Sequence, residues 1–319
     1  MAQFVEQNDQ LQLRGRDFLD LEDFTTEELQ YLLDYAIELK RKQKAGEVYQ
    51  PLKGKTLGMI FEKSSTRTRV SFEVGMYQLG GHPLFLSRND LQIGRGEPIA
   101  DTAQVLSRYV DGIMIRTFAH TTLTDLAKYA SVPVINALTD WSHPCQAMAD
   151  YQTVLEQKGK LAGLKVAFIG DGNNMAHSLM MGAAKFGMHF AIAAPEGYLP
   201  DAEMTARSMT VAASTGGSVL VTGDTREAIA DADIVYTDVW ASMGFEEEQK
   251  IREKAFAEYQ VNEELVQHAK PDYMFLHCLP AHRGEEVSAG VIDGPNSQIF
   301  DEAENRLHAQ KAIMAAIMS

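Results

Sequence analysis

The sequence predicts an α/β protein with two doubly wound parallel-sheet domains, each with helices on both faces, linked by interdomain helices. Short apolar, β-rich runs alternate with helical patterns along almost the whole chain, and this alternation is typical of parallel sheets covered by helices. The 319 residues are enough for two domains of ordinary size. Two sheets therefore suit the predicted strands better than one long sheet.

The predicted elements fall into two groups along the chain. In the first we expect helices at 26–41, 66–79 and 98–108 and strands at 56–61, 82–86, 112–115 and 134–136. In the second we expect strands at 165–170, 189–194, 218–222, 234–237 and 274–277. A helix at 143–157 separates the groups, and a last helix covers 301–318. One domain is thus expected from residues 1–146 and 302–319, and the other from 147–301.

The composition excludes several classes of protein. Hydrophobic residues make up 45% and charged residues 23%, as in soluble globular proteins, and no apolar run is long enough to span a bilayer. The first residues carry no pattern of a secretory signal or transit peptide, so a cytoplasmic location is expected. A net charge of −15 argues against nucleic-acid binding. Two cysteines are too few for a disulfide scaffold.

The strongest motif, residues 61–69, follows a predicted strand and opens a predicted helix. It reads Phe-Glu-Lys-Ser-Ser-Thr-Arg-Thr-Arg. Backbone N–H groups at a helix start attract anions, and the hydroxyls of Ser65, Thr66 and Thr68 and the guanidinium of Arg67 add donors. The alternative is an ordinary helix cap, but a cap needs a single hydroxyl. The motif therefore favours a phosphate site.

A second motif, His143-Pro144-Cys145-Gln146, also lies between a strand and a helix. Pro is common in a first helical turn, so His143 alone could be a capping or core residue. Arg116 ends a preceding strand on the same sheet edge, where ligands bind in open α/β sheets. Arg67, Arg116 and His143 together suit an acyl phosphate whose carbonyl group must be polarised.

Two further motifs complete the pattern. They are Asp-Val-Trp-Ala-Ser-Met-Gly at 238–244 and His-Cys-Leu-Pro-Ala-His-Arg-Gly at 277–284. The four motifs, in this order, resemble the ornithine carbamoyltransferase family over essentially the whole chain. Ser-Thr-Arg-Thr and His-Pro-x-Gln are shared by carbamoyltransferases, whereas the Ser-Met-Gly loop and His-Cys-Leu-Pro mark the ornithine branch.

The resemblance implies an activity and a set of site residues. The activity is carbamoyl transfer from carbamoyl phosphate to L-ornithine, giving L-citrulline and phosphate in arginine biosynthesis, with catabolic use left open. The first domain would bind carbamoyl phosphate and the second ornithine. Carbamoyl phosphate is assigned to Ser65, Thr66, Arg67, Thr68, Gln92, Arg116, His143, Gln146, Cys278, Leu279 and Arg306. Ornithine is assigned to Asn174, Asp238, Ser242 and Met243.

The resemblance also implies catalytic residues and an assembly. Arg116, His143, Asp238 and Cys278 would be catalytic, although a buried thiol that only packs is the open alternative for Cys278. Gln92 would enter the site of a neighbouring subunit, which implies a homotrimer or a multiple of trimers. No cofactor is implied. No metal is expected either, because adjacent strand residues such as His277 and Cys278 should point to opposite faces.

Other functions fit the sequence less well. A nicotinamide dehydrogenase would use Gly170-Asp171-Gly172 after a strand and an acid near Glu196, but Met175 stands where the third glycine belongs. A serine hydrolase around Ser242 lacks the Gly-x-Ser-x-Gly turn. A non-catalytic relative is disfavoured by the full set of polar site residues. Aspartate is the nearest competing acceptor, but acidic Asp238 and the Ser-Met-Gly loop suit an amine. Putrescine and acylated ornithine remain alternative acceptors.

Overall fold

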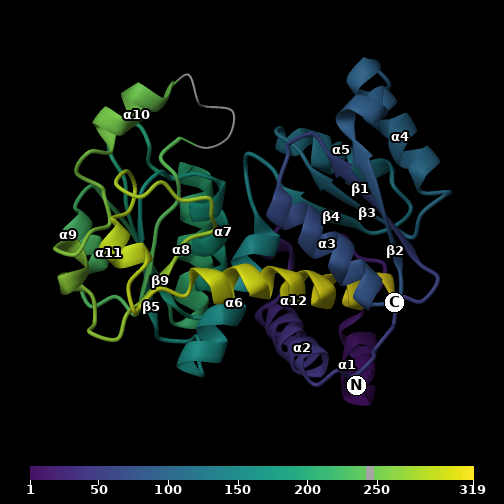
Figure 1. Ribbon diagram of the computed structural model, residues 1–319, viewed down its shortest axis with the longest axis horizontal. Coiled ribbons are helices and arrows are strands. Elements are labelled where there is room, and N and C mark those ends of the chain that lie inside the picture. Colours follow the sequence, from purple (N-terminus) through teal and green to yellow (C-terminus); the bar gives the residue numbers. More distant parts are fainter. Residues whose placement is uncertain (242–247) are drawn as a thin grey trace. The chain divides into compact units, whose positions relative to one another are not determined.

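The computed structural model describes residues 1–241 and 248–319. The chain forms two compact units, Met1–Gln152 with Glu304–Ser319, and Thr153–Ala303. The sequence predicted a first domain of residues 1–146 and 302–319 and a second domain of residues 147–301. The divisions fall inside two helices, α6 (Pro144–Lys158) and α12 (Ile299–Met318), both labelled in Figure 1.

The N-terminal unit contains a parallel sheet of order β2-β1-β3-β4. Its strands are β1 (Thr56–Phe61), β2 (His82–Ser87), β3 (Gly112–Arg116) and β4 (Val134–Leu138). The chain runs outward from β1 to β2 and then crosses back to β3, so the strand order reverses between β1 and β3. This reversal is the point where open α/β sheets bind their ligands.

Crossovers between parallel strands are almost always right-handed, which places helices on both faces of a sheet whose strand order reverses. Helix α3 (Thr66–Gln78) covers one face, and α4 (Ile99–Leu106) and α5 (His120–Tyr129) pack together on the other. Helix α3 also contacts α12, where the side-chain amide nitrogen of Gln310 donates to the Ser71 hydroxyl at 2.6 Å. The remaining helices are α1 (Ala2–Leu11), α2 (Thr26–Lys44) and the 3-10 turns Leu21–Asp23, Arg88–Asp90 and Gln92–Arg95.

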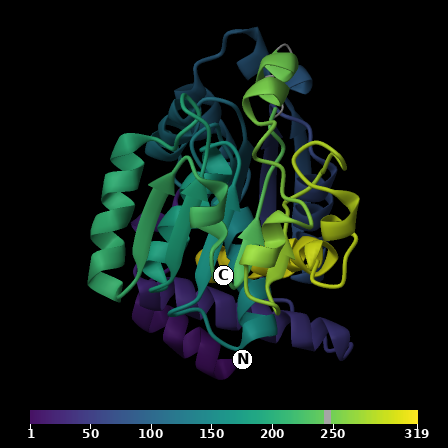
Figure 2. The same ribbon diagram turned by 90° about the vertical axis from the view of Figure 1, so that its left-hand side faces the viewer.

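The C-terminal unit contains a second parallel sheet, of order β7-β6-β5-β8-β9. Its strands, seen in Figure 2, are β5 (Lys165–Ile169), β6 (His189–Ala193), β7 (Ser218–Thr222), β8 (Ile234–Tyr236) and β9 (Met274–Leu276). The order reverses between β5 and β8. Helices α7 (Asn174–Lys185) and α8 (Ala202–Thr215) pack together, and α9 (Thr225–Ile229) contacts β5, β6 and β7. The shorter elements are α10 (Gln249–Ala255), the 3-10 turn Leu265–His268 and α11 (Ala289–Ile292).

The predicted fold class, two parallel-sheet α/β domains with helices, is confirmed. Strands β3 and β4 are buried at every position because helices cover both faces of a parallel sheet. The edge strand β2 is only partly buried, whereas the other edge strand, β4, is bridged along its outer side by Phe18. No helix among residues 1–241 and 248–319 is long and apolar enough to cross a membrane.

Candidate active site

The first predicted motif forms the start of α3, directly beyond β1. The Ser65 side chain caps the helix by accepting a hydrogen bond from the backbone N–H of Thr68 at 3.2 Å. The sequence offered a helix cap as the alternative to a phosphate site, and this cap is present; it holds the first turn in place with its N–H groups at the carboxyl edge of the sheet. This end of a helix favours an anion.

Two guanidinium groups meet the fully buried hydroxyl of Thr68. Arg116, at the end of β3, donates from Nη1 to Thr68 Oγ1 at 3.4 Å. Arg306, on α12, donates from Nη2 to the same oxygen at 3.3 Å. Phe61 and Arg116 are register partners on adjacent strands, which explains why the start of α3 and Arg116 meet. The sheet reversal thus concentrates positive charge beside the helix start.

Gln146, in the first turns of α6, joins this group through both ends of its amide. Its Oε1 accepts from Arg306 Nη1 at 2.6 Å, and its Nε2 donates to Asp150 Oδ1 at 2.7 Å. These two contacts fix the direction of the amide. A carbonyl oxygen has two lone pairs, so Oε1 can accept a second hydrogen bond from a ligand N–H.

His143 lies just before α6 and is buried. Burial is the largest cause that holds its pKa well below the usual value, and the charges of four cationic side chains add to it: Arg306, Arg116, Lys63 and Arg67. The imidazole is therefore neutral near pH 7. A neutral imidazole carries one N–H donor, which can polarise a carbonyl oxygen. We call Ser65–Thr68, Arg116, His143, Gln146 and Arg306 the cationic cluster.

The C-terminal unit presents a different group at its own reversal point, between β5 and β8. Asp238 follows β8 and accepts hydrogen bonds from Cys278 Sγ at 3.2 Å and from Asn173 Nδ2 at 3.0 Å. Asn173 follows β5 and caps α7 by accepting from the N–H groups of Met175 and Ala176. Asn174 is the first residue of α7. We call Asn173, Asn174, Asp238 and Cys278 the acidic cluster.

The expectation that His277 and Cys278 point to opposite sides of a strand is wrong. Strand β9 ends at Leu276, so neither residue lies on it, and ligand atoms of Asp238, His277 and Cys278 lie within 4.8 Å of one another. Protein groups nevertheless engage both ring nitrogens of His277. Nδ1 accepts from the N–H of Leu279 at 2.9 Å, and Nε2 lies 3.1 Å from Glu286 Oε1.

Comparison with known protein families shows which family has domains like the two that carry these clusters. Residues 16–156 match the carbamoyl-P binding domain of the aspartate/ornithine carbamoyltransferases, and residues 162–317 match their Asp/Orn binding domain. The chain belongs to the aspartate/ornithine carbamoyltransferase family. The cationic cluster falls mainly within the first of these family domains and the acidic cluster within the second.

Individual relatives match over nearly their full length. An ornithine carbamoyltransferase of Anoxybacillus flavithermus is 64% identical, with 97% of this chain and 98% of the relative covered. The structure of the Pyrococcus furiosus ornithine carbamoyltransferase has a TM-score of 0.94 at 58% identity, covering 96% of this chain and 98% of that one. The anabolic enzyme of Campylobacter jejuni has a TM-score of 0.88 at 43% identity, covering 94% and 97%.

Most of the residues expected in a carbamoyltransferase site lie in the two clusters. Gln92 does not, because it is exposed in the 3-10 turn Gln92–Arg95. Leu279 follows Cys278 directly, while Ser242 and Met243 lie outside the described residues. Sequence reasoning did not single out Asn173, although its place before a helix was a signal for a cap. It also missed Glu302, whose carboxylate accepts from the N–H of His277 at 2.8 Å.

The turn after β5 also argues against a dinucleotide site. The N–H of Gly172, which a pyrophosphate would need, donates instead to the carbonyl oxygen of Tyr198 at 2.8 Å. A Cβ atom at Gly172 would lie 2.1 Å from the backbone nitrogen of Pro200. The glycine therefore permits the close approach of the protein's own chain rather than of a cofactor.

Proposed function

We propose that this protein transfers the carbamoyl group of carbamoyl phosphate to the δ-amine of L-ornithine, giving L-citrulline and phosphate. The observation that carries the proposal is the neutral, buried His143 surrounded by four cationic side chains beside the start of α3. Such a cluster can hold a phosphate dianion and still donate an uncharged hydrogen bond to the adjoining carbonyl group.

In this proposal the start of α3 binds the phosphate. The backbone N–H groups and hydroxyls of Ser65, Thr66 and Thr68 donate to its oxygens, and Arg67 adds charge. Arg116 bridges the phosphate and the carbonyl oxygen, because its guanidinium already reaches Thr68 Oγ1 at 3.4 Å. Planar guanidinium groups suit such two-pronged recognition of oxyanions.

The remaining groups orient the carbamoyl end. His143 donates to the carbonyl oxygen, and Gln146 accepts from the carbamoyl nitrogen through the second lone pair of Oε1. Arg306 holds that amide in place through its 2.6 Å hydrogen bond. The backbone carbonyls of Cys278 and Leu279 are assigned to the same nitrogen on the family resemblance alone.

The reaction begins with attack of the neutral δ-amine on the carbonyl carbon. Negative charge then develops on the carbonyl oxygen, where Arg116 and His143 stabilise it, and one such donor contributes roughly 3–4 kcal/mol. The bond between carbon and the phosphate oxygen breaks as the amine nitrogen becomes bonded to carbon. Phosphate leaves with the amine proton.

In this proposal the acidic cluster binds ornithine, together with Ser242 and Met243. Asn174 takes the α-carboxylate, and Asp238, Ser242 and the Met243 backbone take the amino groups. An aliphatic amine has a pKa of about 10 in water and must lose its proton before it attacks. The Cys278 thiol, oriented by its 3.2 Å hydrogen bond to Asp238, would accept from the δ-amine and help to desolvate it.

The proposal extends to assembly, location and direction. We propose a homotrimer, or a multiple of trimers, in which exposed Gln92 serves the neighbouring site. Both cysteines are free thiols, which suits the reducing cytoplasm. Relatives from Pyrococcus furiosus and Campylobacter jejuni are named anabolic, which supports use in arginine biosynthesis.

Carbamoylation rates with four acceptors test the proposal. Purified protein with carbamoyl phosphate should release phosphate with L-ornithine and far more slowly with putrescine, N-acetylornithine or aspartate. Arg67→Ala should abolish turnover, because it removes charge from the phosphate site. Equal rates with aspartate, or full turnover by Arg67→Ala, would contradict the assignment.

A further inference from the structure

We propose that the C-terminal unit carries a second binding site, for a divalent transition-metal ion of the Zn²⁺ type. Its ligands are His282, Glu285 and Glu286, which lie on one tight turn after β9. The site lies outside both clusters described above.

Three ligand atoms converge at this turn. His282 Nδ1 lies 3.6 Å from Glu286 Oε2 and 3.8 Å from Glu285 Oε2. One ligand atom from each of the three residues lies within 4.8 Å of the others. Zn²⁺ binds nitrogen and oxygen at about 2.0–2.2 Å in a tetrahedron, which separates its ligands by roughly 3.4 Å. Small rotations of the half-exposed His282 and Glu285 side chains would close the difference.

The buried carboxylate of Glu286 independently favours a cation at this turn. The residue is fully buried, and its Oε1 accepts from the N–H of His282 at 2.6 Å and faces His277 Nε2 at 3.1 Å. Its Oε2, the oxygen that faces the His282 ring, has no hydrogen bond among the residues that the structure describes. A buried anionic oxygen without a donor is costly, and a cation at this point would satisfy it.

The backbone holds the ligands in place before any ion binds. The N–H of Glu285 donates to the carbonyl oxygen of His282 at 3.0 Å, and the N–H of Gly284 donates to that of Val287 at 2.8 Å. Gly284 has a φ of 93°, a left-handed conformation that glycine adopts without strain. The turn therefore brings His282 back over the two glutamates.

The charge around the turn favours a cation. Arg283, the nearest guanidinium in sequence, is engaged by Asp293 at 2.6 Å and 2.8 Å. Glu285 also lines a hollow of about 440 Å³ together with Glu253 and Glu258, so the approach to the site is acidic. An imidazole nitrogen with two carboxylate oxygens suits Zn²⁺ or Co²⁺ better than Mg²⁺ or Ca²⁺, which prefer oxygen ligands alone.

Glu286 links the proposed metal site to the acidic cluster. Its Oε1 faces His277, and the neighbouring Cys278 donates to Asp238. Hydrogen-bonded partners of this kind orient metal ligands in proteins. An ion on Oε2 would draw charge from the carboxylate, weaken its bond to His277 and so change the KM for ornithine.

Titration of the metal-free full-length protein with Co²⁺ tests the site, because Co²⁺ takes zinc positions and absorbs visible light when its geometry is tetrahedral. The wild type should bind one equivalent. His282→Ala and Glu285→Gln should each bind at least about tenfold more weakly. Both side chains are partly exposed, so both variants should fold, and circular dichroism checks this.

Cys278→Ser is the matched control for binding of the ion at the other group of potential ligands, Asp238, His277 and Cys278. If the proposal is right, this variant should bind Co²⁺ as tightly as the wild type does. Neither protein should show a thiolate-to-metal absorption band, because the proposed ligands include no cysteine. Loss of binding in Cys278→Ser but not in His282→Ala would overturn the proposal, since the ion would then lie on Asp238, His277 and Cys278. Unchanged binding in both His282→Ala and Glu285→Gln would overturn it as well.

Discussion

His143 shows how a side chain's surroundings decide what it can do. Burial is the largest single cause that lowers its pKa, and the charges of four cationic neighbours lower it further. A protonated imidazole would add a further positive charge to an already cationic pocket. The neutral ring keeps one nitrogen as a donor and the other as an acceptor, which suits polarisation of a carbonyl oxygen without proton transfer.

Replacement of His143 by asparagine should therefore lower kcat more than binding. We expect kcat to fall about 100-fold to 1,000-fold, the typical cost of losing one donor to a developing oxyanion, because the asparagine amide is shorter than the imidazole ring and does not place its N–H groups where the ring does. The KM for carbamoyl phosphate should change only a few-fold, because the phosphate contacts remain. Steady-state kinetics with varied carbamoyl phosphate measure both constants.

His120→Asn is the control for this prediction. His120 lies in the same unit, and burial again lowers its pKa, but its ring contacts Thr139 and no part of the cationic cluster. Its kcat should stay within about twofold of wild type. A His143→Asn enzyme with normal kcat would remove His143 from the reaction.

At the scale of single elements, the cap of α7 has two tasks. Asn173 Oδ1 accepts from two backbone N–H groups of the helix, while its Nδ2 donates to Asp238 Oδ2 at 3.0 Å. The first task stabilises the helix, and the second orients a carboxylate proposed to bind the substrate amine. Two substitutions at this position separate the tasks.

Asn173→Ala should lower the free energy of unfolding by roughly 1 kcal/mol, the usual cost of a lost cap, and should raise the KM for ornithine. Asn173→Ser keeps a capping oxygen without adding charge, so its stability should stay near wild type. It loses the amide donor to Asp238, so its KM should rise as well. Urea unfolding and ornithine titrations measure the two effects, and a normal KM in Asn173→Ser would show that Asp238 needs no such orientation.

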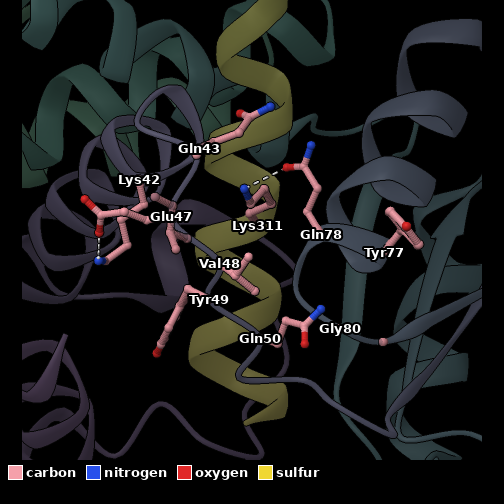
Figure 3. Close-up of a pocket in the computed structure, with 13 residues that line it drawn as sticks. Lys42, Gln43, Glu47, Val48, Tyr49, Gln50, Tyr77, Gln78, Gly80 and Lys311 are labelled. Carbon is pink, nitrogen blue, oxygen red and sulfur yellow. Dashed lines mark hydrogen bonds and ion pairs between the residues drawn. The ribbon is translucent and has the colours of Figure 1, made fainter.

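The junction of α2, α3 and α12 supports a prediction about pH. Lys311, on α12, lines a hollow of about 420 Å³ with Lys42 and Glu47, and its ammonium donates to Gln78 Oε1 at 2.8 Å (Figure 3). Burial lowers the pKa of Lys311 to about 8. The unfolded chain binds this proton more tightly than the folded protein, so stability should rise as the pH increases from about 8 to about 10.5.

Lys311→Met should therefore stabilise the protein by about 1 kcal/mol at pH 7, since it removes a buried charge. Because wild-type Lys311 loses its proton as the pH rises, the difference should shrink above pH 8. Lys42→Met is the control, because the ammonium of Lys42 pairs with Glu47 at 2.5 Å and should give no such gain. Urea unfolding at several pH values measures the effect, and a constant difference from pH 7 to pH 10 would contradict the reasoning.

The sequence predicted the strands better than it predicted which distant residues contact one another. Each strand prediction lies within two residues of an observed strand at both ends, as with 134–136 against Val134–Leu138, because apolar β-rich runs specify buried parallel strands. Because the strands were placed correctly, the motifs that follow them indicated most residues of the cationic cluster. Contacts between distant segments could not be predicted, such as Arg252 with Asp171 at 2.7 Å, because they depend on packing that no local pattern encodes.

The prediction that His277 and Cys278 point to opposite faces of a strand was wrong for a related reason. It required that β9 continue through His277 and Cys278, but the strand ends at Leu276. Glu302, far along the chain, accepts from the N–H of His277 in place of a strand neighbour. The alternation of side chains along a strand therefore does not apply to these two residues.

At the scale of the whole molecule, the exposed position of Gln92 leads to a prediction about assembly. Gln92 is exposed in its turn, and its backbone carbonyl accepts from the N–H groups of Gly96 and Glu97. Among the described residues, no hydrogen bond joins its side chain to the cationic cluster of its own chain. If Gln92 completes the site of a neighbouring subunit, then two defective chains can restore each other's activity.

Mixed assemblies test this directly. Gln92→Ala and Arg67→Ala chains, each nearly inactive alone, should recover activity when they are unfolded together and refolded at equal concentrations. A site that combines an intact Arg67 from one chain with an intact Gln92 from its neighbour should form in about a quarter of positions if chains mix at random. Mixing the folded proteins without exchange is the control. No recovery in verified mixed assemblies would place Gln92 in the site of its own chain, or outside the active site altogether.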